Sequence, residues 1–165
     1  MPNEIYGISV EDVIWTAGFF DGEGMVAISR LLGNGTFRLL VEIVQVQSPP
    51  VQPVFSMLLE FGGSIYSVPL SPGRQPKWRW QIGGRDAALF LRTIRPYLKF
   101  KREEVDIALE FFSWYSIAGA RRGKRFGQGG SEPISAAVKQ QATQYWEQLR
   151  QIRPRKGPSP HQQPV

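Results

Sequence analysis

The chain has 165 residues, the length of one ordinary domain, which is enough to bury a core without disulfides or metal. It contains no cysteine, so a disulfide scaffold, a cysteine-based zinc finger and thiolate catalysis are excluded. Its formal net charge is +6, a balance that suits a polyanionic partner.

The sequence shows no signal peptide and no apolar run of the roughly 18 residues that a membrane helix requires. We therefore expect an intracellular protein, in a bacterial cytoplasm or an organelle, that does not contact membranes. Residues 154–165 contain four prolines and no apolar periodicity, which predicts a disordered tail. Residues 1–153 are then expected to form a single domain.

Charge is segregated along the chain. Residues 1–29 hold five acids and no lysine or arginine, whereas residues 30–102 hold eleven basic residues and three acids. Residues 118–165 are again basic. This pattern predicts a basic working surface with an acidic element placed within it, although solvated helix faces are the alternative.

The first predicted element is a helix over about residues 9–20. Ser9 is a candidate N-cap, and Asp12 follows it at capping-box spacing. Asp21-Gly22-Glu23-Gly24 is expected to break the helix, because glycines permit backbone angles that a helix does not use and let another backbone approach closely.

Two hairpins and a helix are predicted next. Residues 25–32 and 37–47 form the first hairpin around Gly33-Asn34-Gly35, and residues 64–70 and 77–82 form the second. The helix lies between them and ends at Gly62-Gly63. Alternation places one set of side chains in the core: Phe37, Leu39, Val41, Ile43, Trp78, Trp80 and Ile82.

Three more helices are predicted, over about residues 84–95, 101–117 and 132–152. The fold class is therefore α+β, with an αββαββα core, a curved antiparallel or mixed sheet with helices on one face, and C-terminal helices. A long basic sheet face suits the groove of a DNA duplex. The side chains expected to face the duplex are Ser29, Arg38, Leu40, Glu42, Ser67, Lys77, Arg79 and Gln81. Arg121, Arg122 and Lys124 are interpreted either as phosphate contacts or as a flexible basic loop.

The ten residues from Trp15 to Gly24, WTAGFFDGEG, resemble the signature of the LAGLIDADG homing endonucleases. The order of predicted elements matches that family. The segment from Pro96 to Lys101, PYLKFK, is similar to the lysine-bearing segment of its single-motif, homodimeric branch. The resemblance implies a saddle-shaped, DNA-binding sheet.

The resemblance also implies roles for individual residues. Glu23 is the direct metal ligand, Gly22 lends its carbonyl oxygen, and Asp21 is mainly structural. Lys101 stabilises developing charge. Gln45 positions solvent near the metal, with Gln47 or Ser48 as alternatives for that role. The implied cofactor is Mg²⁺, with Mn²⁺ as a substitute and Ca²⁺ binding without supporting cleavage.

The residues themselves favour a dimer. Ala17 and Gly18 are small, so two copies of the helix over residues 15–20 can approach closely and bring both Glu23 carboxylates to a shared axis. The remaining chain has no second copy of the motif, so the acidic pair requires a homodimer and a near-palindromic target.

The leading hypothesis is a Mg-dependent DNA endonuclease, for which the resemblance further implies cleavage of both strands with 3′ overhangs and an intron as genetic home. The sheets would lie in the major groove, with the acidic motifs over the minor groove. Two alternatives stay open: a maturase that binds intron RNA, and a catalytically silent DNA-binding protein.

Overall fold

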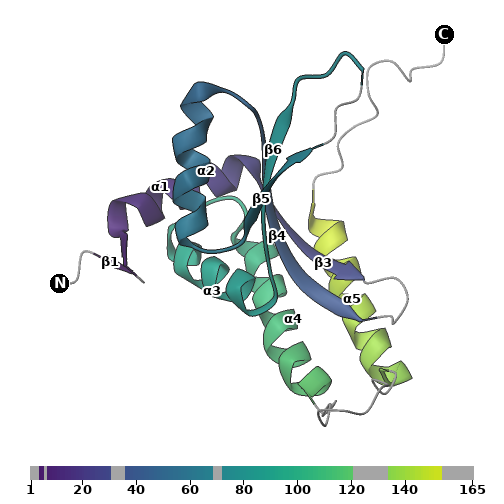
Figure 1. The fold of residues 1–165 in the computed structure, drawn as a ribbon. Coiled ribbons are helices and arrows are strands. Elements are labelled where there is room, and N and C mark those ends of the chain that lie inside the picture. The colour runs from purple at the N-terminus through teal and green to yellow at the C-terminus, as the bar shows by residue number, and fades with distance from the viewer. Residues whose placement is uncertain (1–3, 6, 31–35, 69–71, 121–133, 154–165) are drawn as a thin grey trace, which may run out of the picture.

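The computed structural model describes residues 4–5, 7–30, 36–68, 72–120 and 134–153. These residues form an α+β fold whose main sheet has the strand order β3-β4-β6-β5, with antiparallel neighbours (Figure 1). In chain order the elements are β1 (Glu4–Ile5), β2 (Ile8–Ser9), α1 (Val10–Glu23), β3 (Gly24–Arg30), β4 (Phe37–Val46), the 3-10 helix η1 (Pro49–Val51), α2 (Gln52–Glu60), β5 (Ser64–Val68), β6 (Lys77–Gly83), α3 (Gly84–Ile94), the 3-10 helix η2 (Arg95–Tyr97), α4 (Arg102–Ala120) and α5 (Ala136–Ile152). The predicted order is confirmed, while the short β1–β2 pair was not predicted.

One face of the sheet carries the core. The predicted inward side chains of β4 are all buried, and Trp80 and Ile82 of β6 join them. Trp78 is half-buried and packs against Phe55 of α2. Helices α1 and α3 pack on this face, whereas α5 lies against α4 and the edge strand β3 (Figure 1). The alternation in the sequence therefore identified the core correctly.

Helix α1 does not end where the sequence predicted. Ser9 caps its N-terminus by accepting a hydrogen bond from the Asp12 N–H, as expected. The helix continues through Asp21, Gly22 and Glu23, and β3 begins directly at Gly24. Gly22 tolerates helical backbone angles as well as turn angles, so it did not stop this helix, whose C-cap is Gly24.

Gly24 is required by space and not by its backbone angles. Its φ is −75°, an ordinary value for any residue. A β-carbon at this position would lie 2.1 Å from a ring carbon of Phe20, which is itself fully buried. The close contact is therefore with a side chain of the same helix, and not with another backbone as predicted.

The last helix starts later than predicted. Helix α5 begins at Ala136 instead of residue 132, because Ser135 caps it by accepting a hydrogen bond from the Val138 N–H. The predicted Gly33-Asn34-Gly35 turn, the basic residues Arg121, Arg122 and Lys124, and the tail lie outside the described residues. Among the helices that the structure describes, none is long and apolar enough to cross a membrane.

Replacing Gly24 by alanine is expected to lower the free energy of unfolding by about 1–3 kcal/mol, because the added methyl group overpacks the Phe20 ring. Gly22→Ala is the matched control, since nothing lies within 4 Å of a β-carbon there. That control is expected to gain up to about 1 kcal/mol from helix propensity. Urea denaturation of both variants measures the difference, and equal midpoints would contradict the steric explanation.

Candidate acidic site and nucleic-acid interface

Helix α1 has two distinct faces. Its core stripe consists of Val13, Thr16, Ala17, Phe20 and Asp21, all buried. The opposite stripe is exposed although it is apolar or small: Ile14 and Trp15 are each 48% exposed, and Gly18 and Gly22 follow at helical spacing. Exposed apolar stripes of this kind mark contact surfaces.

The structure corrects the expectation for Ala17. This residue is completely buried in the core of its own chain, so it does not offer a surface to a second copy. Gly18 is exposed, and nothing lies within 4 Å of where its β-carbon would be. Close approach to another helix therefore depends on Gly18 and Gly22. Trp15 beside them is held by stacking on Phe19, with ring centroids 5.1 Å apart.

Asp21 and Glu23 occupy different environments at the end of α1. Glu23 is exposed and is the last residue of the helix. Asp21 is only 9% exposed, and its carboxylate accepts hydrogen bonds from three successive backbone N–H groups of Lys99, Phe100 and Lys101, at 2.6, 3.3 and 2.9 Å. A carboxylate held by backbone N–H groups is a strong structural connection. Asp21 thus joins α1 to the segment before α4.

Lys101 is held at the same place. Its Nζ donates a hydrogen bond to the backbone carbonyl of Asp21, one of the carbonyl groups in the last turn of α1. The last carbonyl groups of a helix have no partner within it and carry partial negative charge, so an ammonium group is stabilised there. Asp21, whose carbonyl Lys101 contacts, lies two residues before Glu23 in the sequence. The structure therefore places the lysine and the acid at one helix end.

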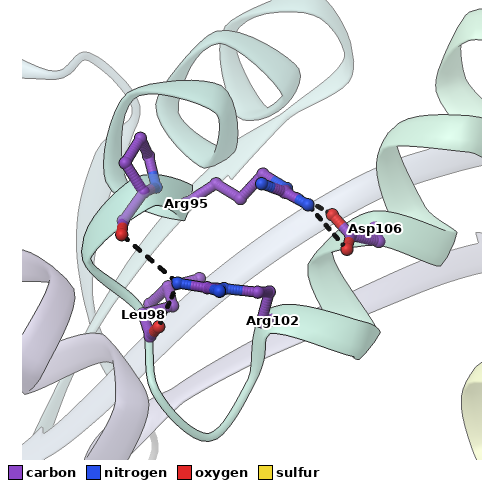
Figure 2. Close-up of polar contacts among 5 residues, drawn as sticks. Arg95, Leu98, Arg102 and Asp106 are labelled. Atoms are coloured by element: carbon purple, nitrogen blue, oxygen red, sulfur yellow. Dashed lines mark hydrogen bonds and ion pairs between the residues drawn. The ribbon is translucent and has the colours of Figure 1, made fainter.

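The segment before α4 is also held from the opposite side. Arg102 Nη2 donates to the carbonyl oxygens of Pro96 and Leu98, at 3.3 and 3.1 Å (Figure 2). Arg95 forms a two-pronged ion pair with Asp106 of α4, and this hydrogen bond and charge raise the pKa of Arg95 above its ordinary value. Leu98 between them is fully buried. These contacts fix the backbone that presents Lys101.

The three candidates for the solvent-positioning role lie at the end of β4. Gly24 pairs with Ile43, so Gln45 is the next residue on the same face and lies nearest to the acidic motif along the strand. Gln47 lies further along, where its amide donates to Ser67 Oγ and the Lys77 carbonyl, at 3.4 and 3.3 Å. Ser48 follows as the residue before η1.

The second face of the sheet carries none of the described helices. Directly opposed residues in an antiparallel pair point to the same face. The register therefore places seven of the predicted side chains together on this open face: Ser29, Arg38, Leu40, Glu42, Lys77, Arg79 and Gln81. The expectation for Ser67 is wrong, because Ser67 pairs with Trp78 and shares the helix-covered face.

The sequence analysis missed two further features. Tyr66 pairs with Arg79 on the open face and is 45% exposed. At the edge of β3, a pocket of 260 Å³ is lined by Ala27, Ile28, Trp146, Leu149, Arg150 and Arg153. Arg150 stacks over Trp146, and burial lowers the pKa of Arg153 despite the opposing charge of Glu104. The helical spacing of Trp146, Arg150 and Arg153 was the sequence signal that could have predicted this group of side chains.

The donor set at the end of α1 fits a hard divalent cation but is incomplete in one chain. The Glu23 carboxylate and the Gly22 carbonyl are oxygen donors of the type that Mg²⁺ prefers. Among the described residues, no group of three or more acids or histidines comes together. A bound cation would therefore need further oxygen ligands from a second copy, a substrate or water.

These features define an α+β protein with an open basic sheet face and an acidic helix end. No family model and no curated protein sequence matches the chain, but solved structures do. The homing endonuclease I-CvuI, in complex with a DNA target in the presence of Mg, matches over 90% of this chain and 86% of its own, with a TM-score of 0.66 and 15% identity.

Two other structures match with less coverage of their own chains. The LAGLIDADG homing endonuclease I-GzeII in complex with DNA matches 84% of this chain and 43% of its own, with TM-score 0.55 and 13% identity. The meganuclease I-SmaMI bound to DNA matches 87% and 45%, with TM-score 0.54 and 14% identity. The chain therefore has the fold of the LAGLIDADG homing endonucleases.

Asp21→Asn is expected to lower the free energy of unfolding by about 1.5–3 kcal/mol, because the charged acceptor of three backbone N–H groups is lost. Glu11→Gln removes the same charge at an exposed position of the same helix and is expected to cost at most about 1 kcal/mol. Thermal or urea unfolding at neutral pH compares them. Equal effects of the two variants would show that Asp21 does not hold the segment before α4.

Proposed function

We propose that this protein is a site-specific, Mg-dependent DNA endonuclease that acts as a homodimer on a long, near-palindromic duplex. The observation that carries the proposal is one placement: α1 ends in exposed Glu23, and the next residue begins the sheet whose open face carries Arg38, Lys77 and Arg79. The same fold is bound to DNA in I-CvuI. Residues 1–153 are proposed to form the working domain, with an intron as its genetic home and 3′ overhangs as its product.

The homodimer is supported by the exposed stripe of α1. Trp15 and Ile14 would bury apolar surface, and Gly18 and Gly22 would let two helix backbones approach. The chain covers 86% of I-CvuI but less than half of I-GzeII and I-SmaMI, as expected if a working unit needs two such folds. A two-fold axis at this stripe would bring both Glu23 carboxylates together and impose a near-palindromic target.

The proposed chemistry assigns one task to each group. Mg²⁺, when bound, would stabilise the attacking and leaving oxygens of phosphodiester hydrolysis. Glu23 and the Gly22 carbonyl would hold it, and the repulsion between two such carboxylates makes the empty site favourable for cations. Lys101, whose Nζ contacts the helix end, is proposed to stabilise developing negative charge on a phosphate. Gln45 is proposed to orient water beside them.

Glu23→Gln is expected to reduce cleavage by about 100-fold or more, because the variant keeps the shape of the side chain but loses the charge that holds the metal. The assay incubates the full chain with a randomised duplex library and Mg²⁺ and sequences the cut ends. Wild type is expected to yield a near-palindromic consensus with 3′ overhangs. Glu11→Gln, the same change at an exposed position far along α1, is expected to cut normally.

If no cut ends appear, two binding measurements on the folded wild type separate the alternatives: selection of bound duplexes from the same library, and binding to structured intron RNA. If folded wild type binds a duplex consensus but never cuts, the protein is a silent DNA-binding protein. If it ignores duplex DNA and binds structured intron RNA, it is a maturase. Either result rejects the endonuclease proposal.

Gly18→Leu is expected to weaken dimerisation about tenfold or more, since overpacking an interface costs about 1–3 kcal/mol. The exposed position has room for the side chain in its own chain, so the fold should be retained. Ala137→Leu on an exposed position of α5 is the control and should remain dimeric. Sedimentation velocity across a concentration series makes the comparison. A wild-type protein that is monomeric where it cuts DNA would exclude the α1 dimer.

A further inference from the structure

Four polar side chains on the open face form one connected network of hydrogen bonds and an ion pair across three strands. Tyr66 of β5 donates its hydroxyl hydrogen to Gln81 Oε1 of β6 at 2.9 Å. Gln81 Nε2 in turn donates to Glu42 Oε1 of β4 at 2.9 Å. The Arg79 guanidinium lies 3.8 Å from the same carboxylate oxygen. Gln81 and Arg79 therefore contact Glu42 directly, and Tyr66 is connected to Glu42 through Gln81.

Glu42 is more buried than Arg79 and Tyr66, which belong to the same network. The residue is only 7% exposed, whereas the side chain of Arg79 is 41% exposed and Tyr66 is 45% exposed. A buried carboxylate is stable only while its partners remain in place. To reach a base edge itself, Glu42 would have to give up those partners. Its position suits it to orient its neighbours, and not to contact the duplex.

The chemistry of the contacts fixes the orientation of the Gln81 amide. A carboxylate only accepts hydrogen bonds, so the amide nitrogen has to face Glu42 and the amide oxygen has to face Tyr66. One N–H and one lone pair of Gln81 remain for an outside partner. This donor and acceptor pair matches the edge of adenine, as the fork of an arginine matches guanine. Side chains held in advance lose less freedom on binding.

We propose that Glu42 is a positioning residue that sets the sequence preference of the open face. It holds the Gln81 amide and the Arg79 guanidinium ready to read neighbouring base pairs, an adenine and a guanine, without contacting a base itself. This inference rests on the proposed binding of double-stranded DNA.

The test is selection of bound duplexes from a randomised library, without cleavage, for full-length wild type, Glu42→Gln, Arg79→Ala and Gln81→Ala. Arg79→Ala and Gln81→Ala are each expected to relax one position per half-site by about 5- to 150-fold. Glu42→Gln is expected to relax those same two positions and no other. Total affinity for duplex DNA should stay the same or rise, as it should in Glu60→Gln, which removes an exposed acid on α2.

A second variant keeps the test decisive if Glu42→Gln fails to fold. Tyr66→Phe removes only the hydroxyl group that holds the Gln81 oxygen, so it should relax the Gln81 position and leave the Arg79 position intact. The inference is overturned if Glu42→Gln relaxes a position of its own, or if Tyr66→Phe alters only the Arg79 position. A folded wild type that selects no consensus would instead reject the proposed DNA binding, and this inference with it.

Discussion

The structure depends on one buried carboxylate. Asp21 accepts hydrogen bonds from three successive backbone N–H groups that lie 78 to 80 residues further along the chain. A carboxylate only accepts hydrogen bonds, so the three N–H groups satisfy the buried acid and the acid satisfies them. It attaches the end of α1 to the segment that carries Lys101. The acidic motif and the lysine segment, separate in sequence, are thereby one structural unit.

Local patterns predicted most of the fold because local physics determines it. Alternation along β4 and β6 identified the buried faces, and Ser9 identified the start of α1. The end of α1 was mispredicted, because Gly22 keeps helical backbone angles and Asp21 finds its partners near residue 100. Those partners have no local signal. A resemblance to known sequences supplied the predicted roles of Asp21 and Lys101, but not the contact between them.

The open face shows the same limit in the sheet. Alternation divides the side chains of a strand into two sets that point to opposite faces. It does not say which set lies on the same side of the sheet as a given set of the neighbouring strand. In β4 and β6 the apolar residues show clearly which set of side chains lies on the core face. In β5 the run of Ser64, Ile65, Tyr66, Ser67 and Val68 has no clean alternation, so its phase follows from the pairing of Ile65 with Trp80. That pairing turns Ser67 toward the helices and Tyr66 toward the open face, which reverses the prediction for Ser67.

The exposed acid Glu23 and the basic side chains of the open face belong to directly connected elements. An exposed acid repels phosphate, so a surface that binds a polyanion near such an acid needs cationic groups that are fixed relative to it. Here Glu23 is joined by one peptide bond to the first residue of β3, and β3 pairs with β4, which carries Arg38. A sheet is stiff along its strands, so the distance from the acid to the cations is set by register. The buried Gly24 permits this direct transition, since only a residue without a side chain fits against Phe20 at the point where helix becomes strand.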